Sequence, residues 1–291
     1  MVASDLLLNA VVAGVLLGGF YTAVSLGVSV AFGLLDVVNI AHPVFVILGS
    51  YLAYAMNVTL GLDPILTGLA FTPAFYALGV AVYRVYYASF EKTGQESLRG
   101  LVFFFGVLFI VEVGLLLQFG VDYRLVEAGY IGETLRLGPL SVALRLAVPC
   151  LVALALTAAL AAVLHGTSYG RAIRAVAQDS FALRLMGVDP VRVKAFAFGL
   201  ATATASLAGA LLIMIGPVEP AMNREYIGRV FAIAVLGGMG SVGGTLAAAV
   251  ILGVAESLTA TFYGPSWALA VSFGILLLTL AVRPAGLFGQ A

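Results

Sequence analysis

Long apolar runs recur along this sequence, and they restrict its fold more than any other feature does. The first run, residues 6–32, exceeds the roughly 20 residues that a helix needs to cross a bilayer. Of the 291 residues, 62% are hydrophobic and 10% are charged, which is more apolar surface than a soluble domain buries. These observations predict an all-α fold, a polytopic transmembrane helical bundle with the lipid bilayer as its main solvent.

About eight or nine membrane spans are expected, in one transmembrane domain that covers residues 1–291. The number depends on whether one of two internal breaks is re-entrant. The first residues lack the basic segment of a secretory signal, so the first span is expected to be retained. Asp63 is expected to cap the third span, and Pro284 to end the last one. The predicted spans are 6–32, 44–57, 64–84, 101–119, 143–164, 195–215, two segments within 226–258, and 267–282.

The first break follows the first span and places polar residues at membrane depth. Asp36, Asn39 and His42 lie there, and Pro43 follows at once. Irregular backbone at this depth survives only where protein buries it or a water-filled cavity meets it. Asn39 and His42 are therefore candidate residues of a translocation path. The other interpretation of His42 is a capping residue.

The second break is the segment GGMGSVGG at positions 237–244, in which five of the eight residues are glycine. Glycine interrupts a helix and exposes backbone groups to a solute. The alternative is close helix packing through Gly240 and Gly244. The break also suggests an internal repeat of the kind that transporters carry, with residues 39–53 corresponding to 237–255. The candidate path residues here are Gly237, Gly238, Gly240, Ser241, Gly243 and Gly244.

The longest polar interval on one side of the apolar runs is residues 166–194, the basic segment. Its pattern predicts one helix over 170–186, with Thr167 or Ser168 as the N-cap and Gly187 after the C-terminus. Apolar residues recur at helical spacing on one face of this helix. Such a helix either lies on lipid headgroups or docks onto a cytoplasmic protein. The face contains Ile173, Val176, Ala177, Ser180 and either Leu183 or Arg184.

The distribution of Lys and Arg predicts the orientation in the membrane. If residues 84–99 and the basic segment are cytoplasmic, nine of these cations lie inside and five outside. This bias favours an external N-terminus and a cytoplasmic C-terminus, provided that there are nine crossings. The nine are Arg84, Lys92, Arg99, Arg171, Arg174, Arg184, Arg192, Lys194 and Arg283, and the five are Arg124, Arg136, Arg145, Arg224 and Arg229.

Several classes of function are excluded by composition and motifs. The formal net charge is zero, so nothing points to nucleic acid binding. Cys150 is the only cysteine, which excludes an internal disulfide and a cysteine-based zinc site. The hydrolase motifs and the P-loop are absent, so the chain is expected to be neither an enzyme nor a cofactor-binding protein. An ATPase, if transport uses one, must be another chain.

Glu112 and Glu256 are acidic residues inside predicted spans. A charge at the centre of a span costs roughly 2.5–3.5 kcal/mol, so each residue must face the bundle or lose its charge. A proton-relay role would make the chain an ion- or proton-coupled secondary transporter of a small polar solute. The alternative is an interhelical hydrogen bond.

Four stretches, in matching order over nearly the whole chain, resemble one family. They are NIAHPVFVILGSYLA at 39–53, GRAIRAVAQD at 170–179 with MGV at 186–188, FAIAVLGGMGSVGGT at 231–245 with Gly253 and Glu256 after it, and RPAGLFG at 283–289. These stretches resemble LivH-type inner-membrane permeases of branched-chain amino acid ABC importers. One departure is His42-Pro43, where the family pattern is His followed by a small residue such as Gly.

The resemblance implies a multi-pass permease of the cell inner membrane that translocates branched-chain or related amino acids, although related permeases carry urea or short amides. It implies three kinds of partner: cytoplasmic ABC ATPase subunits, a second and related permease subunit, and a periplasmic or extracellular amino-acid-binding protein. The basic segment would be the cytoplasmic coupling segment that docks on the ATPase through its apolar face. The coupling residues implied are Gly170, Arg171, Arg174, Ala175, Asp179, Arg184 and Gly187.

Overall fold

The computed structural model describes residues 2–93, 97–138, 140–283 and 285–288, and most of these residues are helical. Pro284, expected to end the last span, and Gly289 of the C-terminal motif lie outside the described residues. The elements are α1 (Val2–Leu35), α2 (His42–Leu60), α3 (Pro64–Ser89), η1 (Glu91–Thr93), α4 (Ser97–Phe119), β1 (Thr134–Leu137), β2 (Leu140–Ala143), α5 (Leu144–Gly166), α6 (Ser168–Gln178), α7 (Ser180–Leu185), α8 (Pro190–Ile215), η2 (Pro220–Met222), α9 (Asn223–Gly237), α10 (Val242–Phe262), η3 (Pro265–Trp267) and α11 (Ala268–Val282).

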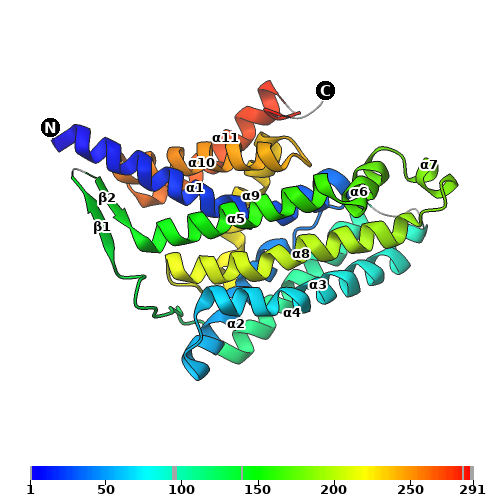
Figure 1. The fold of residues 1–291 in the computed structure, drawn as a ribbon, viewed down its shortest axis with the longest axis horizontal. Helices are drawn as coiled ribbons and strands as arrows, with labels where there is room; N and C mark the ends of the chain where they lie inside the picture. The colour runs from blue at the N-terminus through cyan, green and yellow to red at the C-terminus, as the bar shows by residue number, and fades with distance from the viewer. Residues whose placement is uncertain (1, 94–96, 139, 284, 289–291) are drawn as a thin grey trace.

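The long helices run side by side along the longest dimension of the molecule (Figure 1). The N-terminus and the β1–β2 hairpin lie at one end, which we call the hairpin end; α6 and α7 lie at the other, the α7 end. Within the described residues, eight helical segments are long and apolar enough to cross a membrane: α1, α2, α3, α4, α5, α8, α10 and η3 with α11. The prediction of a polytopic all-α membrane protein is confirmed, with the lower of the two expected span numbers.

Helix α8 is the centre of the bundle and packs against α1, α2 and α3. The small residues Ala201, Ala205 and Gly209 recur every fourth position along it and are buried. A Cβ atom at Gly209 would lie 2.1 Å from the backbone oxygen of Val46 in α2, closer than real atoms approach. This face of small residues is therefore a contact at which the two backbones meet.

Helices α1 and α10 make a second close contact through glycine. A Cβ atom at Gly14 would lie 2.6 Å from the Cα of Val254, and one at Gly18 would lie 2.5 Å from the Cα of Val250. The two helices are antiparallel, because the partner's number falls as the α1 number rises. Gly14 and Gly18, four residues apart, thus form a GxxxG contact whose partner is α10.

The two most extensive helix pairings, α1 with α10 and α3 with α8, relate the two ends of the chain. Helices α1–α4 and α8–α11 follow one pattern: the first helix of each set packs on the third helix of the other. Both pairings are antiparallel. This pattern supports an internal repeat, but it matches α2 with α9 and α3 with α10. The correspondence expected from the sequence, 39–53 with 237–255, pairs α2 with α10 and differs from it.

Between the predicted spans 101–119 and 143–164 the structure has a short β-hairpin, for which no strand was predicted. Thr134 pairs with Ala143 and Leu137 with Leu140. Gly138 adopts a φ of 64° between the strands, a conformation that glycine reaches without strain. The hairpin leads directly into α5, whose first residue hydrogen-bonds to the backbone of Glu133.

Candidate functional site

The basic segment forms two helices where the sequence predicted one. The Thr167 side chain accepts a hydrogen bond from the Gly170 amide at 3.0 Å, so Thr167 is the N-cap of α6. Asp179 has extended backbone and its side chain accepts from the amides of Phe181 and Ala182, at 2.8 and 2.9 Å. The expected helix over 170–186 is thus wrong in its middle, because an Asp side chain competes for amides there and starts α7.

The end of α7 agrees with the prediction. Gly187 has a φ of 79°, which favours glycine, and its amide donates to the Arg184 carbonyl. The Val188 amide donates to the Leu183 carbonyl. The chain then turns into α8, whose N-cap Asp189 accepts from the Val191 amide.

The three largest side chains of the predicted docking face are not available to a partner, although Ala177 and Ser180 are exposed. Ile173, Val176 and Leu183 are buried against the chain's own helices. A different set is exposed: Phe181 (68%), Leu185 (75%) and Met186 (80%), which we call the α7 patch. Helical spacing in the sequence indicates that one face is buried, but it does not say which molecule covers it. Phe181 and Leu185 are four residues apart, so they share a helix face that points away from Leu183. This spacing was the sequence signal for the α7 patch.

The predicted coupling residues divide by position. Arg171 and Arg184 are exposed, and Ala175 is half-buried. The Arg174 guanidinium donates to the Leu164 carbonyl at the end of α5. A Cβ atom at Gly170 would lie 2.1 Å from that same oxygen. Gly170, Arg174 and Asp179 therefore hold the basic segment in its own shape and against α5.

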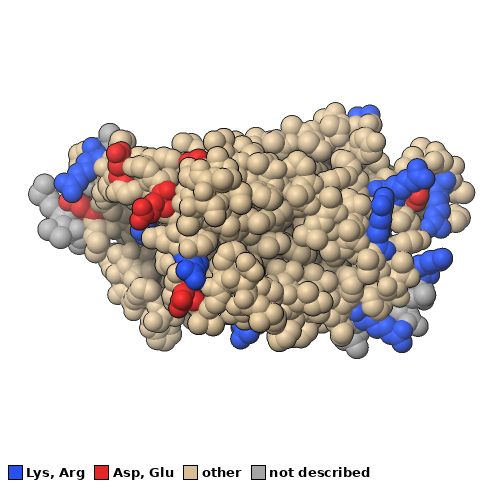
Figure 2. All heavy atoms as spheres, turned by 90° about the horizontal axis from the view of Figure 1, so that it is seen from below, with Lys and Arg blue, Asp and Glu red and all other residues tan. Residues whose placement is uncertain are grey.

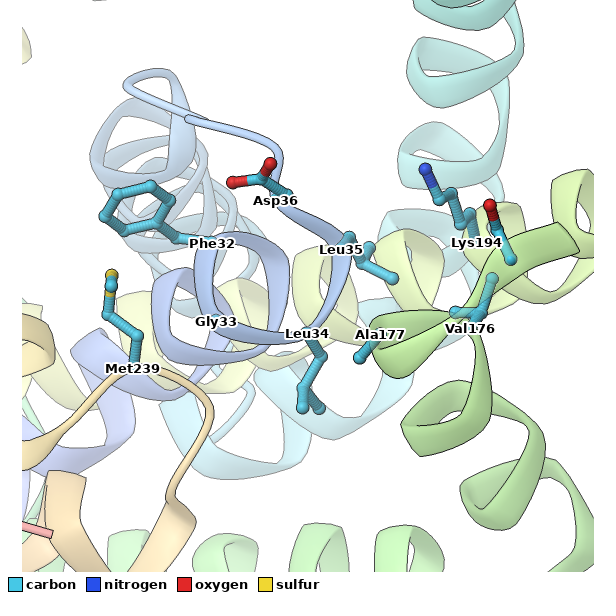
Figure 3. Close-up of a pocket in the computed structure, with 10 residues that line it drawn as sticks. Phe32, Gly33, Leu34, Leu35, Asp36, Val176, Ala177, Lys194 and Met239 are labelled. Carbon is cyan, nitrogen blue, oxygen red and sulfur yellow. The ribbon is translucent and has the colours of Figure 1, made fainter. Parts of the chain in front are cut away.

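Four parts of the chain surround a cavity of about 320 Å³ at the α7 end (Figure 3). The end of α1, the α6–α7 junction, the first turns of α8 and the glycine break meet there. Lys194, on its wall, forms an ion pair with Glu91 at 2.6 Å. Asp36 has a φ of 56°, a strained value for a residue with a side chain. The cavity is lined by Phe32, Gly33, Leu34, Leu35, Asp36, Val176, Ala177, Ser180, Lys194 and Met239.

The first break turns back into the bundle. His42 is fully buried, and its Nε2 atom lies 3.2 Å from the carbonyl oxygen of Val24. Val24 precedes the end of α1 by 11 residues, so α2 begins about 16 Å inside that end. Asn39 accepts from the Ala41 amide at 3.1 Å, which shapes the turn before α2. The break between the two helices is observed, and both candidate path residues are buried within the bundle.

The glycine break is used for close packing. A Cβ atom at Gly33 of α1 would lie 1.8 Å from the Gly240 nitrogen, and one at Gly244 would lie 1.9 Å from the Gly237 oxygen. Gly238 and Gly240 both have a φ of 85°. Ser241 caps α10 by accepting from the Gly244 amide at 3.0 Å. Gly243 is exposed, with nothing within 4 Å of a Cβ atom there. The packing interpretation holds for these glycines, and their place on the path stays a prediction.

Both buried glutamates are hydrogen-bonded between helices. Glu112 of α4 accepts from Asn223 at 2.9 Å and from Arg224 at 3.0 Å. Glu256 of α10 accepts from Tyr21 at 2.5 Å, from Arg229 at 3.1 Å, and from Ser272. The interhelical interpretation therefore fits both residues.

Arg224 and Arg229, predicted to be cations of the outer side, lie in α9 and not in a loop. Asn223, a further partner of Glu112, was not predicted from the sequence. The signal was present: two arginines and a glutamate occur within seven residues at the start of an apolar run.

Comparison with known proteins gives a consistent result. Residues 10–280 match the family described as branched-chain amino acid transport system / permease component. The chain is 27% identical to the LivH permease protein of Escherichia coli (strain K12), over 95% of this chain and 94% of LivH. It is 27% identical to the BraD permease protein of Pseudomonas aeruginosa, over 97% and 96%. A 120-residue part, 40% of the chain, is 37% identical to 28% of the LivM permease protein of Salmonella typhimurium. No solved structure matches.

Proposed function

Because the chain belongs to the family of permease components of branched-chain amino acid transport systems, we propose that it provides the path by which a branched-chain or related amino acid crosses the inner membrane. It is a transmembrane subunit of an ABC importer, and residues 1–291 act as one permease domain. The energy comes from ATP hydrolysis by separate subunits, since the sequence has no P-loop.

The partners follow from the relatives and from the sequence. The likeness to both LivH and LivM supports a second, related permease subunit beside this one. Cytoplasmic ATPase subunits supply the nucleotide site that this chain lacks. A periplasmic or extracellular binding protein delivers the amino acid to the hairpin end.

Charge supports a cytoplasmic α7 end. Lys and Arg side chains predominate at that end of the molecule, whereas acidic and basic side chains mix at the hairpin end (Figure 2). Positive residues concentrate on the cytoplasmic side of membrane proteins. The N-terminal end of α1 is then external and the end of α11 cytoplasmic, which requires α9 to count as a ninth, shorter crossing beside the eight helices of span length.

The observation that carries the coupling mechanism is the α7 patch, three large apolar side chains exposed at the cytoplasmic end. A short helix with an apolar face fits a groove on a partner, and the exposed Arg171 and Arg184 beside it set the register. Movement of α7 reaches α6, and through the walls of the 320 Å³ cavity it reaches α1 and the glycine break. Nucleotide-driven closure of the ATPases thus tilts the spans as rigid bodies.

The test is reconstitution of the assembled importer, with leucine uptake and ATP hydrolysis measured together. Leu185→Asp places a charge in the α7 patch, so we expect the ATPase subunit to dissociate and uptake to be lost. The matched control is Leu135→Asp on β1, an exposed leucine at the opposite end, which should keep both activities. Normal coupling in Leu185→Asp would count against the α7 patch as the docking element. Uptake by this chain alone under a pH gradient would establish the secondary transporter instead.

A further inference from the structure

Helix α9 begins inside the bundle at membrane depth. Its first two residues, Asn223 and Arg224, both bond to Glu112 of α4. Glu112 precedes the end of α4 at Phe119 by seven residues, which is about 10 Å of helix. The chain therefore dips from the hairpin end through η2 before α9 starts. The N-terminal end of α9 opens within the thickness of the membrane.

The first two turns of α9 carry a chain of charges. Arg224 bonds to Glu112 on one side. Arg229 lies 3.5 Å from Glu225 and 3.1 Å from Glu256, which joins α9 to α10. The cluster thus contains two guanidinium groups and three carboxyl groups, so one more positive group would balance its charge.

Part of this cluster is exposed, although it lies at membrane depth. The Arg224 side chain is 71% exposed and that of Glu225 is 51% exposed. Lipid does not solvate such groups, because a charge at the centre of a span costs roughly 2.5–3.5 kcal/mol. This face of α9 therefore meets water or a ligand. In addition, the Oδ1 atom of the fully buried Asn223 has no hydrogen-bond partner among the described residues.

We propose that the first turns of α9 form the amino-acid-binding site of the translocation path, an inference that rests on the proposed function. The ligand is a zwitterionic α-amino acid. Arg224, at the start of α9, binds the carboxylate, and Glu225 binds the ammonium group. Helices that start at membrane depth present their N-termini to anionic groups of substrates in this way.

The other members of the cluster are positioning residues. Glu112 is buried and holds the Arg224 guanidinium from behind, and Glu256 holds Arg229. Asn223 donates to Glu112 and to the Pro220 carbonyl, so it fixes the turn that leads into α9. The two exposed groups are thereby presented on one short stretch of rigid helix.

The first experiment tests whether this face of α9 is accessible to water, and it needs no ATP. Cys150 is replaced by Ala, and single cysteines are introduced into the assembled importer as Glu225→Cys, Ala221→Cys and Ile110→Cys. Ile110 is the control, because it is 74% exposed on α4 at nearly the depth of Glu112. A membrane-impermeant thiosulfonate should modify Glu225→Cys and Ala221→Cys and leave Ile110→Cys unmodified. If neither α9-side position reacts, the inference is overturned.

The second experiment asks what binds, with Ala221→Cys as reporter because it keeps both charged groups. Leucine should slow its modification, and leucinamide, which lacks the carboxylate, should not. In Arg224→Gln the leucine concentration needed for protection should rise about tenfold or more, the loss expected for a charge-assisted hydrogen bond. The proposed site is overturned if leucine does not change the rate of modification, or if the same leucine concentration protects Arg224→Gln as protects the protein with Arg224. Protection without ATP-driven uptake instead contradicts the proposed function and leaves the site standing.

Discussion

Replacing Gly209 by alanine tests the central packing contact of the bundle. A Cβ atom there would lie 2.1 Å from the Val46 oxygen and 2.6 Å from the Ser50 nitrogen, both backbone atoms of α2. An ordinary contact begins near 3.4 Å, so α2 has to move by about 1.3 Å, which is overpacking of a kind that costs about 1–3 kcal/mol. The movement also strains the 2.7 Å hydrogen bond from Ser50 to the Gly209 carbonyl. A bond of that kind contributes about 1 kcal/mol.

The expected destabilisation by Gly209→Ala is therefore about 2–4 kcal/mol. The matched control is Gly106→Ala on α4, where nothing lies within 4 Å of the new Cβ atom. There the better helix propensity of alanine stabilises by up to about 1 kcal/mol. The two glycine-to-alanine changes should thus shift stability in opposite directions.

The assay is the unfolding equilibrium of the purified protein in mixed micelles, followed by circular dichroism. The melting temperature of Gly209→Ala should fall below that of the unmodified protein, and that of Gly106→Ala should match or exceed it. Equal melting temperatures for the two variants would refute the reasoning, because they would mean that α2 and α8 do not meet backbone to backbone.

Three further outcomes are expected. Asp179→Ala removes the α7 cap, at about 1 kcal/mol, and should weaken co-purification of the ATPase, whereas Asp179→Asn should restore it. Glu256→Gln leaves the buried Arg229 with one carboxylate fewer and should cost about 3 kcal/mol in the unfolding assay; unchanged stability would contradict that ion pair. Burial and the hydrogen bond to Asp63 raise the pKa of Tyr130 above 10.0. This bond should therefore stabilise fully below pH 10.0 and less above it, and Tyr130→Phe should remove that fall in a pH series of melting temperatures.

The local features of the sequence were predictable because their causes are local. Asp63 caps α3, Thr167 caps α6, and Gly187 ends α7, each through hydrogen bonds or backbone angles set within a few residues. Long apolar runs likewise gave the spans, since the bilayer demands them. The middle of the basic segment was missed because Asp179 can either continue a helix or cap the next one.

The features that depend on contacts between distant parts of the chain were harder to predict from the sequence. The period of Ile173, Val176 and Leu183 indicates a buried face, yet the chain's own α5 and α8 neighbours cover it where a partner was expected. The ion pairs of Arg224 and Arg229 could not be predicted, because their partners, Glu112 and Glu256, lie 112 and 27 residues away. The sequence around either residue of such an ion pair does not indicate which distant residue is its partner.

The exchange of partners between the two helix sets bears on biosynthesis. Helix α1 enters the bilayer first, but the glycine contact that holds it, between Gly14 and Gly253, needs nearly the whole chain. Helix α3 likewise waits for α8. The most extensive contacts of α1 and α3 therefore form late in translation, after α8 and α10 have been made, so truncated chains should be targets for quality-control proteases, and assembly is completed only when the last spans leave the translocon.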